Sequence, residues 1–272
     1  MTTTEPENII EVENLVAHYG ERVILNDINL GIRTGEIRVI MGGSGSGKTT
    51  LMRNLLGLNT PSSGSIRILG KDITRISKRE LYAIRRKMGV AFQGGALLGS
   101  MSVAENIELP LRQHTKLDES TIRIMSRMKL EVVNLAGFEN LMPSELSGGM
   151  LKRAALARSI VMDPEMLFFD EPSAGLDPVV SAELDELILR LKDAMNVTIV
   201  VVTHELESAF KIADRITVLG QGNVLMTGTV DEVQHSDNEV IQDMLNRRPR
   251  DEIVNAEEYL ARLTADREQQ RI

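Results

Sequence analysis

A glycine-rich stretch followed at once by a lysine and a threonine has the composition of a phosphate-binding loop. Gly42 and Gly47 stand five positions apart and are followed directly by Lys48 and Thr49. Glycine lets backbone N–H groups curl around phosphate oxygens because no Cβ stands in the way, and the following helix turns its positive end toward the anion. Lys48 is expected to reach the β- and γ-phosphates, and the Thr49 hydroxyl to coordinate Mg²⁺. The residues expected to bind nucleotide here are Gly42, Gly43, Ser44, Gly45, Ser46, Gly47, Lys48, Thr49 and Thr50.

Two acids end an apolar run at residues 166–171, and they could supply the other half of such a site. Asp170 is expected beside Mg²⁺, as a carboxylate that reaches the ion through a water. Glu171 comes next, where a carboxylate just beyond the γ-phosphate could orient or deprotonate an attacking water as a general base. A strand that simply ends in acidic loop residues is the plain alternative. The phosphate loop upstream favours the catalytic interpretation.

Gln93 and His204 also follow short apolar runs, at residues 89–92 and 199–202. His204 ends its run in the same direction as Asp170, so it can reach the edge of the sheet where ligands bind in open α/β folds. Its N–H could donate to the γ-phosphate or hold the water, while the neutral Gln93 could touch both Mg²⁺ and the water. Spacing alone leaves a structural role open for both residues.

The candidate residues can meet at one edge of a sheet if strands and helices alternate along the chain. Alternating apolar and polar residues predict two half-buried strands near the N-terminus, and short apolar runs predict buried strands on either side of a long helical stretch. A capped helix is predicted over residues 77–87, with Ser77 as the cap and Glu80 three positions on. This order predicts an α/β fold with a largely parallel sheet and a helical insert. The predicted strands are residues 10–16, 28–32, 37–41, 65–69, 166–169, 197–202, 216–219 and 224–226, the clearest helix is 180–195, and the helical stretch is 94–162.

Composition narrows the class of protein. The chain has 272 residues, a net charge of −8, no tryptophan and 3% aromatics, which argues against an aromatic, basic surface for nucleic acid. It has no cysteine, so disulfides and thiolate metal sites are excluded. The polar N-terminus does not have the pattern of a secretory signal, and no apolar run approaches the roughly 20 residues of a membrane span. Any membrane role is therefore expected to come through a partner.

The motifs follow one another in a recognisable order. Residues 146–150, LSGGM, open a predicted helix, and a serine cap with two glycines at a helix start forms a second nest for anions. Phosphate loop, Gln93, LSGGM, FFDEP, SAGLD and His204 occur in that order along the chain. In this the chain resembles the ATP-binding cassette family, and the resemblance extends to about residue 246. It implies ATP and Mg²⁺ as cofactors and ATP hydrolysis as the reaction.

The resemblance adds residues to the site. It implies that the serine and glycines of LSGGM are the family signature, which meets the γ-phosphate of ATP held on the other subunit, and that residues 173–177 are the D-loop. Tyr19 matches the aromatic that stacks on adenine, although a plain strand-end tyrosine is also possible. Met150 departs from the usual glutamine, which is a weaker requirement than Ser-Gly-Gly. The contacts added are Tyr19, Ser147, Gly148, Gly149 and Asp177.

The resemblance also implies a fold and an assembly. The fold is a phosphate-loop NTPase (RecA-like) core with a parallel sheet, an N-terminal antiparallel β region and an inserted helical subdomain. The nucleotide-binding domain would cover residues 1–246, with the helical subdomain at 94–162 and an amphipathic tail at 247–272. Because the signature of one subunit completes the site of the other, a homodimer with ATP sandwiched inside is implied. The dimer would drive an integral-membrane permease.

A closer resemblance is to the ATPases of bacterial Mla-type systems, which move phospholipids between the two membranes of diderm bacteria. It rests on residues 92–98, 109–115 and 141–150 and on the C-terminal extension. It implies a STAS-domain accessory subunit, an MCE-domain lipid-binding protein and a place at the cytoplasmic face of the inner membrane. The tail would contact the ATPase dimer or the accessory subunit, or simply cap its own domain.

Two other functions share the catalytic residues. An ATPase of another importer or exporter, for lipoproteins or small solutes, would differ only in its permease contact around residues 94–115. A cassette ATPase acting on DNA or ribosomes would carry a long coiled coil or a second cassette, and the sequence has neither sustained heptads nor a repeat of its motifs. A regulatory nucleotide binder is disfavoured because Glu171 and His204 are both present.

Overall fold

The computed structural model describes residues 7–248. The chain forms two compact units, Met1–Ser236 and Asp237–Ile272. In the second unit the described part contains one helix, α9 (Glu239–Leu245), capped by the side chain of Asn238. The predicted amphipathic helix after residue 249 lies outside the described residues. All further elements belong to the first unit.

A four-stranded antiparallel sheet contains the N-terminal strands, in the order β2-β1-β4-β5. Over most of β1 and β2, buried apolar positions alternate with more exposed polar positions, as a period of two requires, and register shifts in β1 interrupt the pattern. The strands predicted at residues 10–16, 28–32 and 65–69 are thereby confirmed in place. The four strands are β1 (Asn8–Tyr19), β2 (Arg22–Arg33), β4 (Ser63–Ile68) and β5 (Lys71–Asp72).

A six-stranded sheet in the order β10-β9-β3-β8-β7-β6 forms the centre of the unit. From β9 to β6 every neighbouring pair is parallel, and β10 pairs antiparallel with β9 at one edge. Parallel strands direct their carboxyl ends to one edge, so the segments after β3, β6, β7 and β8 meet there. The strands are β3 (Ile37–Gly42), β6 (Met88–Ala91), β7 (Met166–Asp170), β8 (Thr198–Val202), β9 (Arg215–Gly220) and β10 (Asn223–Gly228).

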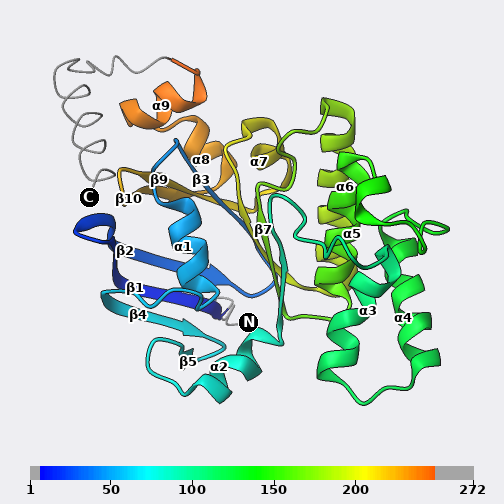
Figure 1. The fold of residues 1–272 in the computed structure, drawn as a ribbon. Coiled ribbons are helices and arrows are strands. Elements are labelled where there is room, and N and C mark those ends of the chain that lie inside the picture. The colour runs from blue at the N-terminus through cyan, green and yellow to red at the C-terminus, as the bar shows by residue number, and fades with distance from the viewer. Residues whose placement is uncertain (1–6, 249–272) are drawn as a thin grey trace, which may run out of the picture. The chain divides into compact units, whose positions relative to one another are not determined.

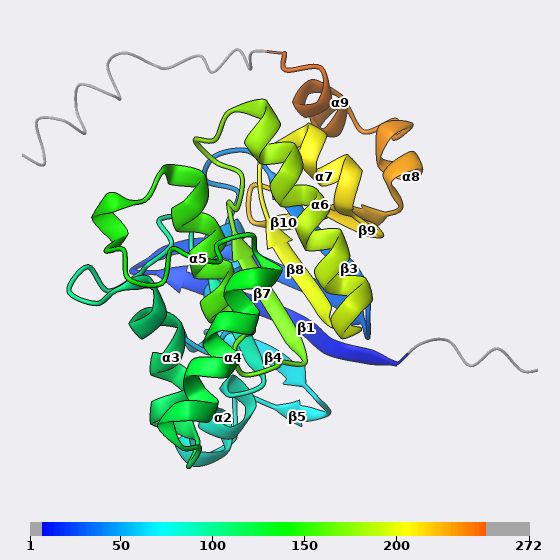
Figure 2. The same cartoon turned by 90° about the vertical axis from the view of Figure 1, so that its right-hand side faces the viewer.

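The hydrophobic core lies between the two sheets, around helix α1 (Lys48–Leu55) (Figure 1). Leu51 and Leu55 of α1 are fully buried against apolar residues of both sheets, including Ile28 of β2 and Phe168 of β7. On the other face of the six-stranded sheet lie α6 (Pro178–Met195) and α7 (Leu206–Ile212) (Figure 2). The layers confirm the predicted fold class, a phosphate-loop NTPase core joined to an antiparallel β region.

Side-chain caps begin the remaining α-helices, while the short 3-10 helix Pro143–Glu145 has none. The predicted cap Ser77 and its partner Glu80 form a complete capping box at the start of α2 (Lys78–Arg85). Between β6 and β7 the chain is helical, as expected for residues 94–162, and α3, α4 and α5 contact one another. The elements of this stretch are α3 (Val103–His114), α4 (Glu119–Val132), η1 (Pro143–Glu145) and α5 (Gly148–Ile160), and α8 (Val230–Gln234) follows later.

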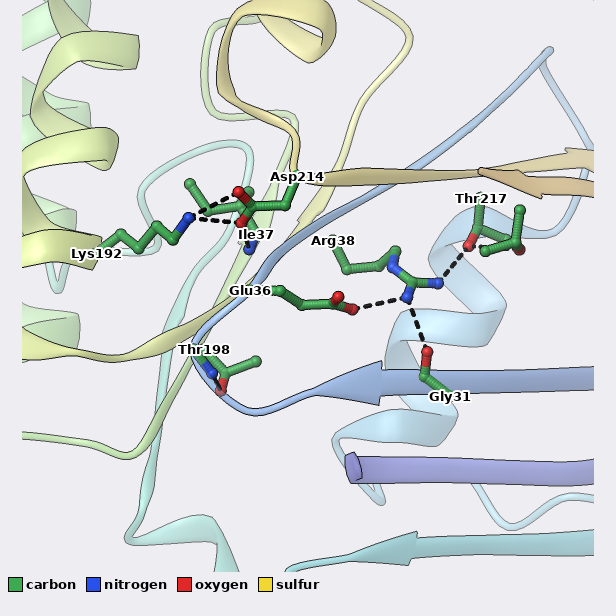
Figure 3. Close-up of polar contacts among 10 residues, drawn as sticks. Gly31, Glu36, Ile37, Arg38, Lys192, Thr198, Asp214 and Thr217 are labelled. Carbon is green, nitrogen blue, oxygen red and sulfur yellow. Dashed lines mark hydrogen bonds and ion pairs between the residues drawn. The ribbon is translucent and has the colours of Figure 1, made fainter. Parts of the chain in front are cut away.

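A buried ion pair joins the two sheets. Arg38 of β3 exposes only 2% of its surface and lies 2.7 Å from the carboxylate of Glu36, which is also buried. The guanidinium also donates to the Gly31 carbonyl of β2 at 2.9 Å and to the Thr217 hydroxyl of β9 at 3.1 Å (Figure 3). Burial lowers the pKa of Arg38, and the charge of Glu36 opposes that shift. One side chain thus connects three strands of two sheets.

Replacing Arg38 by methionine is expected to lower the free energy of unfolding by about 3–5 kcal/mol, because Glu36 would remain buried without its partner. Urea denaturation followed by circular dichroism measures the change. Arg67→Met is the matched control, since Arg67 pairs with Glu11 and Glu13 at the surface, where such pairs contribute about 1 kcal/mol or less. A loss for Arg38→Met no larger than that of the control would contradict the role of the buried pair.

Candidate nucleotide-binding and hydrolysis site

The phosphate loop connects the end of β3 to the start of α1, and two of its glycines are in close contact with neighbouring atoms. A Cβ on Gly42 would lie 2.4 Å from the Leu219 carbonyl oxygen and 2.5 Å from the Ser46 hydroxyl. Gly47 caps α1 with a left-handed backbone (φ +100°), and a Cβ there would lie 2.6 Å from a methyl carbon of Leu25. These two positions therefore accept only glycine, which is the physical reason for the spacing seen in the sequence.

Lys48 lies over this loop. Its ammonium group donates to the carbonyl oxygens of Gly42 at 2.7 Å and Gly43 at 3.0 Å. Burial lowers the pKa of Lys48, and the nearby carboxylates of Glu171 and Asp170 oppose the shift. A phosphate group would exchange neutral carbonyl acceptors for charged oxygens, which bind an ammonium group more strongly. The loop therefore presents a desolvated cation ready for an anion.

The carboxylates of Asp170 and Glu171 stand at the end of β7, on the same edge of the sheet. Burial raises the pKa of Asp170, and the neighbouring charge of Glu171 raises it further, while Arg53 and Lys48 act against the shift. Two adjacent acids in a half-buried position are destabilising without a cation. The electrostatics of this edge thus favour the arrival of positive charge.

Glu171 is the most tightly held residue of the site. Its backbone is left-handed (φ +50°), and its N–H donates to the Val202 carbonyl of β8 at 2.8 Å. One carboxylate oxygen lies 2.8 Å from Nδ1 of His204, and the other accepts from the Thr203 hydroxyl at 3.1 Å. These contacts come from the residues that follow β8, so the strand pairing itself orients the carboxylate. Strained backbone of this kind persists only where surrounding contacts impose it.

His204 lies beside Glu171 and is 58% exposed. Because a carboxylate only accepts, the contact at Nδ1 means that Nδ1 carries a proton. The Nε2 atom of a neutral ring then becomes an acceptor, and it donates only when the ring is charged. With Nδ1–H bound to Glu171, a neutral His204 ring has no second N–H to donate to a phosphate. In the described structure, His204 is coupled first to Glu171.

Gln93 is exposed in a turn two residues beyond β6. The turn is closed by a hydrogen bond from the Gly95 N–H to the Phe92 carbonyl at 2.8 Å. Because β6 pairs with β7, Gln93 lies at the same edge of the sheet as Asp170. The structure thus brings Gln93, Lys48, Asp170, Glu171 and His204 to one edge.

The signature residues lie elsewhere. Ser147 caps α5 by accepting from the Met150 N–H, and Gly149 packs so closely on α6 that a Cβ would lie 2.7 Å from a Val180 methyl carbon. A cavity of about 360 Å³ is bordered by the signature and by Asp177, which caps α6. The phosphate loop lines a separate cavity of about 280 Å³ that shares no residue with it. Within the part of the chain that the structure describes, the signature and the phosphate loop therefore line different cavities.

Tyr19 and Arg22 lie opposite each other in the antiparallel sheet, at the end of β1 and the start of β2. Tyr19 is 84% exposed at the end of β1 and pairs directly with Arg22, the first residue of β2. Arg22 and Ile24, but not Tyr19, line the cavity over the phosphate loop. The sequence interpretation did not include Arg22. The available signal was its position opposite Tyr19 across a two-residue turn, which puts both side chains on one face.

The residues present fit a magnesium nucleotide. Within residues 7–248 no cluster of three or more His, Asp or Glu side chains could hold a metal by itself. Mg²⁺ in nucleotide sites usually takes only one or two protein ligands and completes its shell with phosphate oxygens and waters, so Thr49 and Asp170 are a sufficient donor set. In addition, the buried hydroxyl of Ser46 has no hydrogen-bond partner in the described part of the chain. This loop is built for a ligand rich in oxygen.

Comparisons with known proteins agree with this geometry. Residues 25–174 match the family model described as ABC transporter. The chain is 46% identical over 237 residues to the intermembrane phospholipid transport system ATP-binding protein MlaF of Haemophilus influenzae, covering 87% of this chain and 90% of that one. It is 39% identical to MlaF of Escherichia coli K12, over 88% and 89% of the two chains. It is also 44% identical to a probable ribonucleotide transport ATP-binding protein of Mycobacterium leprae, over 88% and 69%.

Solved structures resemble the fold over the same range. A dimeric ATP-binding cassette in a post-hydrolysis state, bound to ADP and Pi, superposes with a TM-score of 0.75 at 31% identity, covering 81% of this chain and 98% of that one. The cbiO1 protein of Clostridium perfringens, part of the cbiONQ transporter complex, gives a TM-score of 0.78 at 32% identity, over 90% and 97% of the two chains.

Asp170→Asn is expected to raise the thermal unfolding midpoint of the nucleotide-free protein at pH 7. Because folding raises the pKa of Asp170, ionisation of this group destabilises the native state, and that penalty is complete once the pH exceeds the raised pKa. The advantage of the variant should therefore shrink as the pH falls and disappear below the ordinary pKa of an aspartate. Scanning calorimetry from about pH 3 to pH 8 measures it. An equal midpoint at pH 7 would contradict the electrostatic strain.

Proposed function

The chain belongs to the ATP-binding cassette (ABC) transporter family as its ATP-hydrolysing subunit, and from this premise we propose that it hydrolyses MgATP as a sandwiched homodimer to drive phospholipid transport. The observation that carries the catalytic part is the orientation of Glu171 by Thr203 and His204 beside the phosphate loop. The observation that carries the transported substrate is the 46% identity to MlaF, which extends over nearly the full length of both chains.

In the proposed mechanism each group has one task. The phosphate loop and Lys48 bind the β- and γ-phosphates and stabilise charge that develops on them. Glu171 accepts a proton from water as the water oxygen attacks the γ-phosphorus and the bond to the β-phosphate oxygen breaks, giving ADP and phosphate. His204 holds the carboxylate in place. Thr49, Asp170 and Gln93 would hold Mg²⁺, which supplies positive charge to the phosphates.

The sandwich is supported by the separation of the two cavities in one chain. The signature cavity contains the N-terminus of α5, where backbone N–H groups and the Ser147 hydroxyl can receive an anion. We assign Ser147, Gly148, Gly149 and Asp177 to the ATP bound on a second copy, and Tyr19 to stacking on adenine of the chain's own ATP. The similarity to a dimeric cassette that holds ADP and Pi is consistent with this arrangement.

The proposed assembly places the chain at the cytoplasmic face of the inner membrane, bound to an integral-membrane permease. None of the helices within residues 7–248 combines the length and the apolar character that crossing a bilayer requires. By likeness to MlaF, we propose a STAS-domain accessory subunit and an MCE-domain lipid-binding protein as further members. The nucleotide-binding domain would comprise residues 1–246 with the helical subdomain at 94–162. The tail at 247–272 would contact the dimer or the accessory subunit, or simply cap its own domain.

A ribonucleotide is a second candidate for the transported substrate. The relative from Mycobacterium leprae, 44% identical, is described as an ATP-binding protein of ribonucleotide transport. Both candidates keep the same ATPase chemistry and differ only in the permease that the ATPase drives.

Glu171→Gln is expected to bind ATP with an affinity close to that of the unaltered protein and to reduce kcat by at least about a hundredfold, because the amide cannot accept the proton. ATP should then hold the variant as a dimer, visible as a doubled mass in light scattering. The control is Glu186→Gln on α6, which removes an ion pair with Lys211 and borders neither the phosphate-loop cavity nor the signature cavity. Turnover by Glu171→Gln at the unaltered rate would exclude Glu171 as the base.

The transported substrate is tested by affinity purification of the tagged chain from detergent-solubilised membranes, with mass spectrometry of the proteins recovered. A permease with an MCE-domain protein and a STAS-domain subunit is the expected result, and phospholipid should then stimulate ATP hydrolysis by the purified complex. Recovery of a different permease, together with stimulation by ribonucleotides and not by phospholipids, would replace phospholipid as the substrate.

A further inference from the structure

Lys152 contacts the proposed general base from the signature helix. It lies on α5, five residues after Ser147, and its ammonium group donates to the backbone carbonyl of Glu171 at 3.0 Å. Burial lowers the pKa of Lys152, and the charge of Glu171 opposes the shift. An ammonium group taken partly out of water is destabilising unless it is bound. Because burial destabilises a free ammonium group, the hydrogen bond to the Glu171 carbonyl stabilises Lys152 in this position.

Three segments bind the backbone of Glu171, and two of them meet at its carbonyl. This carbonyl also accepts from the N–H of Ala174 at 3.3 Å, which closes the turn that leads into residues 173–177. On the other side of the same residue, the Glu171 N–H is bound to the Val202 carbonyl of β8. The left-handed backbone of Glu171 is thus fixed at both of its peptide groups, one by the sheet and one by Lys152 with Ala174.

The stem of Lys152 lies near the segments that follow β6 and β7. Together with Phe92 and Pro172 it borders a small apolar cavity of about 20 Å³ between α5, β6, β7 and α6. Phe92 precedes Gln93, and Pro172 follows Glu171. The lysine therefore lines one cavity with the residues next to Gln93 and Glu171, and its ammonium group binds the backbone carbonyl of Glu171.

We propose that Lys152 is a positioning residue for the general base: by holding the Glu171 carbonyl it keeps the left-handed peptide, and with it the carboxylate, oriented for attack by water. The inference rests on the proposed role of Glu171. In this arrangement the N-terminus of α5 serves the ATP of the second copy while its second turn serves the base of its own chain. Ser147 would contact the ATP bound on the second copy, whereas Lys152 would contact no nucleotide.

Three substitutions of Lys152 distinguish the effect of its charge from the effect of its hydrogen-bond donor. Lys152→Met keeps the stem and loses the donor, and we expect kcat to fall about tenfold, equivalent to about 1.4 kcal/mol of activation free energy. KM and the dissociation constant of ATP should stay within about twofold, because no contact to nucleotide is removed. Lys152→Arg keeps a charged donor and should recover kcat to within about threefold, and Lys152→Gln, a neutral donor, should lie between.

A double-mutant cycle tests whether Lys152 acts through Glu171. In single-turnover measurements, Lys152→Met should lower the rate about tenfold in the unaltered protein and by less than about twofold in Glu171→Gln, where no base remains to be positioned. Lys116→Met is the matched control, since Lys116 is exposed in the loop between α3 and α4 and should change neither rate. Thermal unfolding of each variant shows whether the fold is retained.

The outcomes are distinct. An unchanged kcat in Lys152→Met, or an equal loss in both backgrounds, overturns the positioning role while leaving Glu171 as the base. A loss that Lys152→Arg does not recover, accompanied by a lowered unfolding midpoint, assigns Lys152 to stability only and also overturns it. If Glu171→Gln itself retains the full rate, the proposed base falls, and the positioning role falls with it.

Discussion

The register between β7 and β8 is the constraint on which the site depends. Asp170 stands opposite Val202 in this parallel pair, so the next residues on each strand, Glu171 and Thr203, emerge side by side at the same edge. The bond from the Glu171 N–H to the Val202 carbonyl continues the ladder by one step, and the carboxylate then meets Thr203 and His204. A slip of one residue would turn each of these side chains to the other face of the sheet. The backbone pairing of β7 with β8 therefore determines where the Glu171 carboxylate lies.

The reacting edge holds charges that the nucleotide-free protein stabilises poorly. Lys48 has a lowered pKa and Asp170 a raised one, and in both cases burial is the main cause. Each group would be more stable in water, yet the fold keeps both near the phosphate loop. A polyphosphate with its metal ion supplies the missing partners, since it brings anionic oxygens to Lys48 and positive charge to Asp170. Binding energy at this edge thus comes partly from relief of strain that folding has introduced.

Helix α5 connects parts of the molecule that the sequence keeps apart. Its N-terminus carries the signature, Lys152 reaches Glu171, and Arg158 donates to the carbonyls of Gly95 and Ala96 in the segment that follows Gln93. In each of the last two contacts a half-buried cation binds backbone carbonyls, and burial lowers the pKa of both side chains. These contacts connect the segments around Gln93 and Glu171 to the helix that begins with the signature. In a dimer, this would relate the closure at one nucleotide to the geometry of hydrolysis at the other.

The sequence by itself determined the family, the α/β fold and the local motifs, because these follow from short-range chemistry. Gly42 and Gly47 are required by close packing within the loop, Ser77 and Glu80 cap a helix three residues apart, and apolar runs mark the buried strands. Only the tertiary structure decided what depends on contacts between distant segments. It placed the signature in a cavity separate from the phosphate loop, paired His204 with Glu171 through Nδ1, and brought Arg22 to the nucleotide pocket and Lys152 to the Glu171 carbonyl. Sequence spacing has no information on these contacts, because they are fixed by strand register and helix packing across tens of residues.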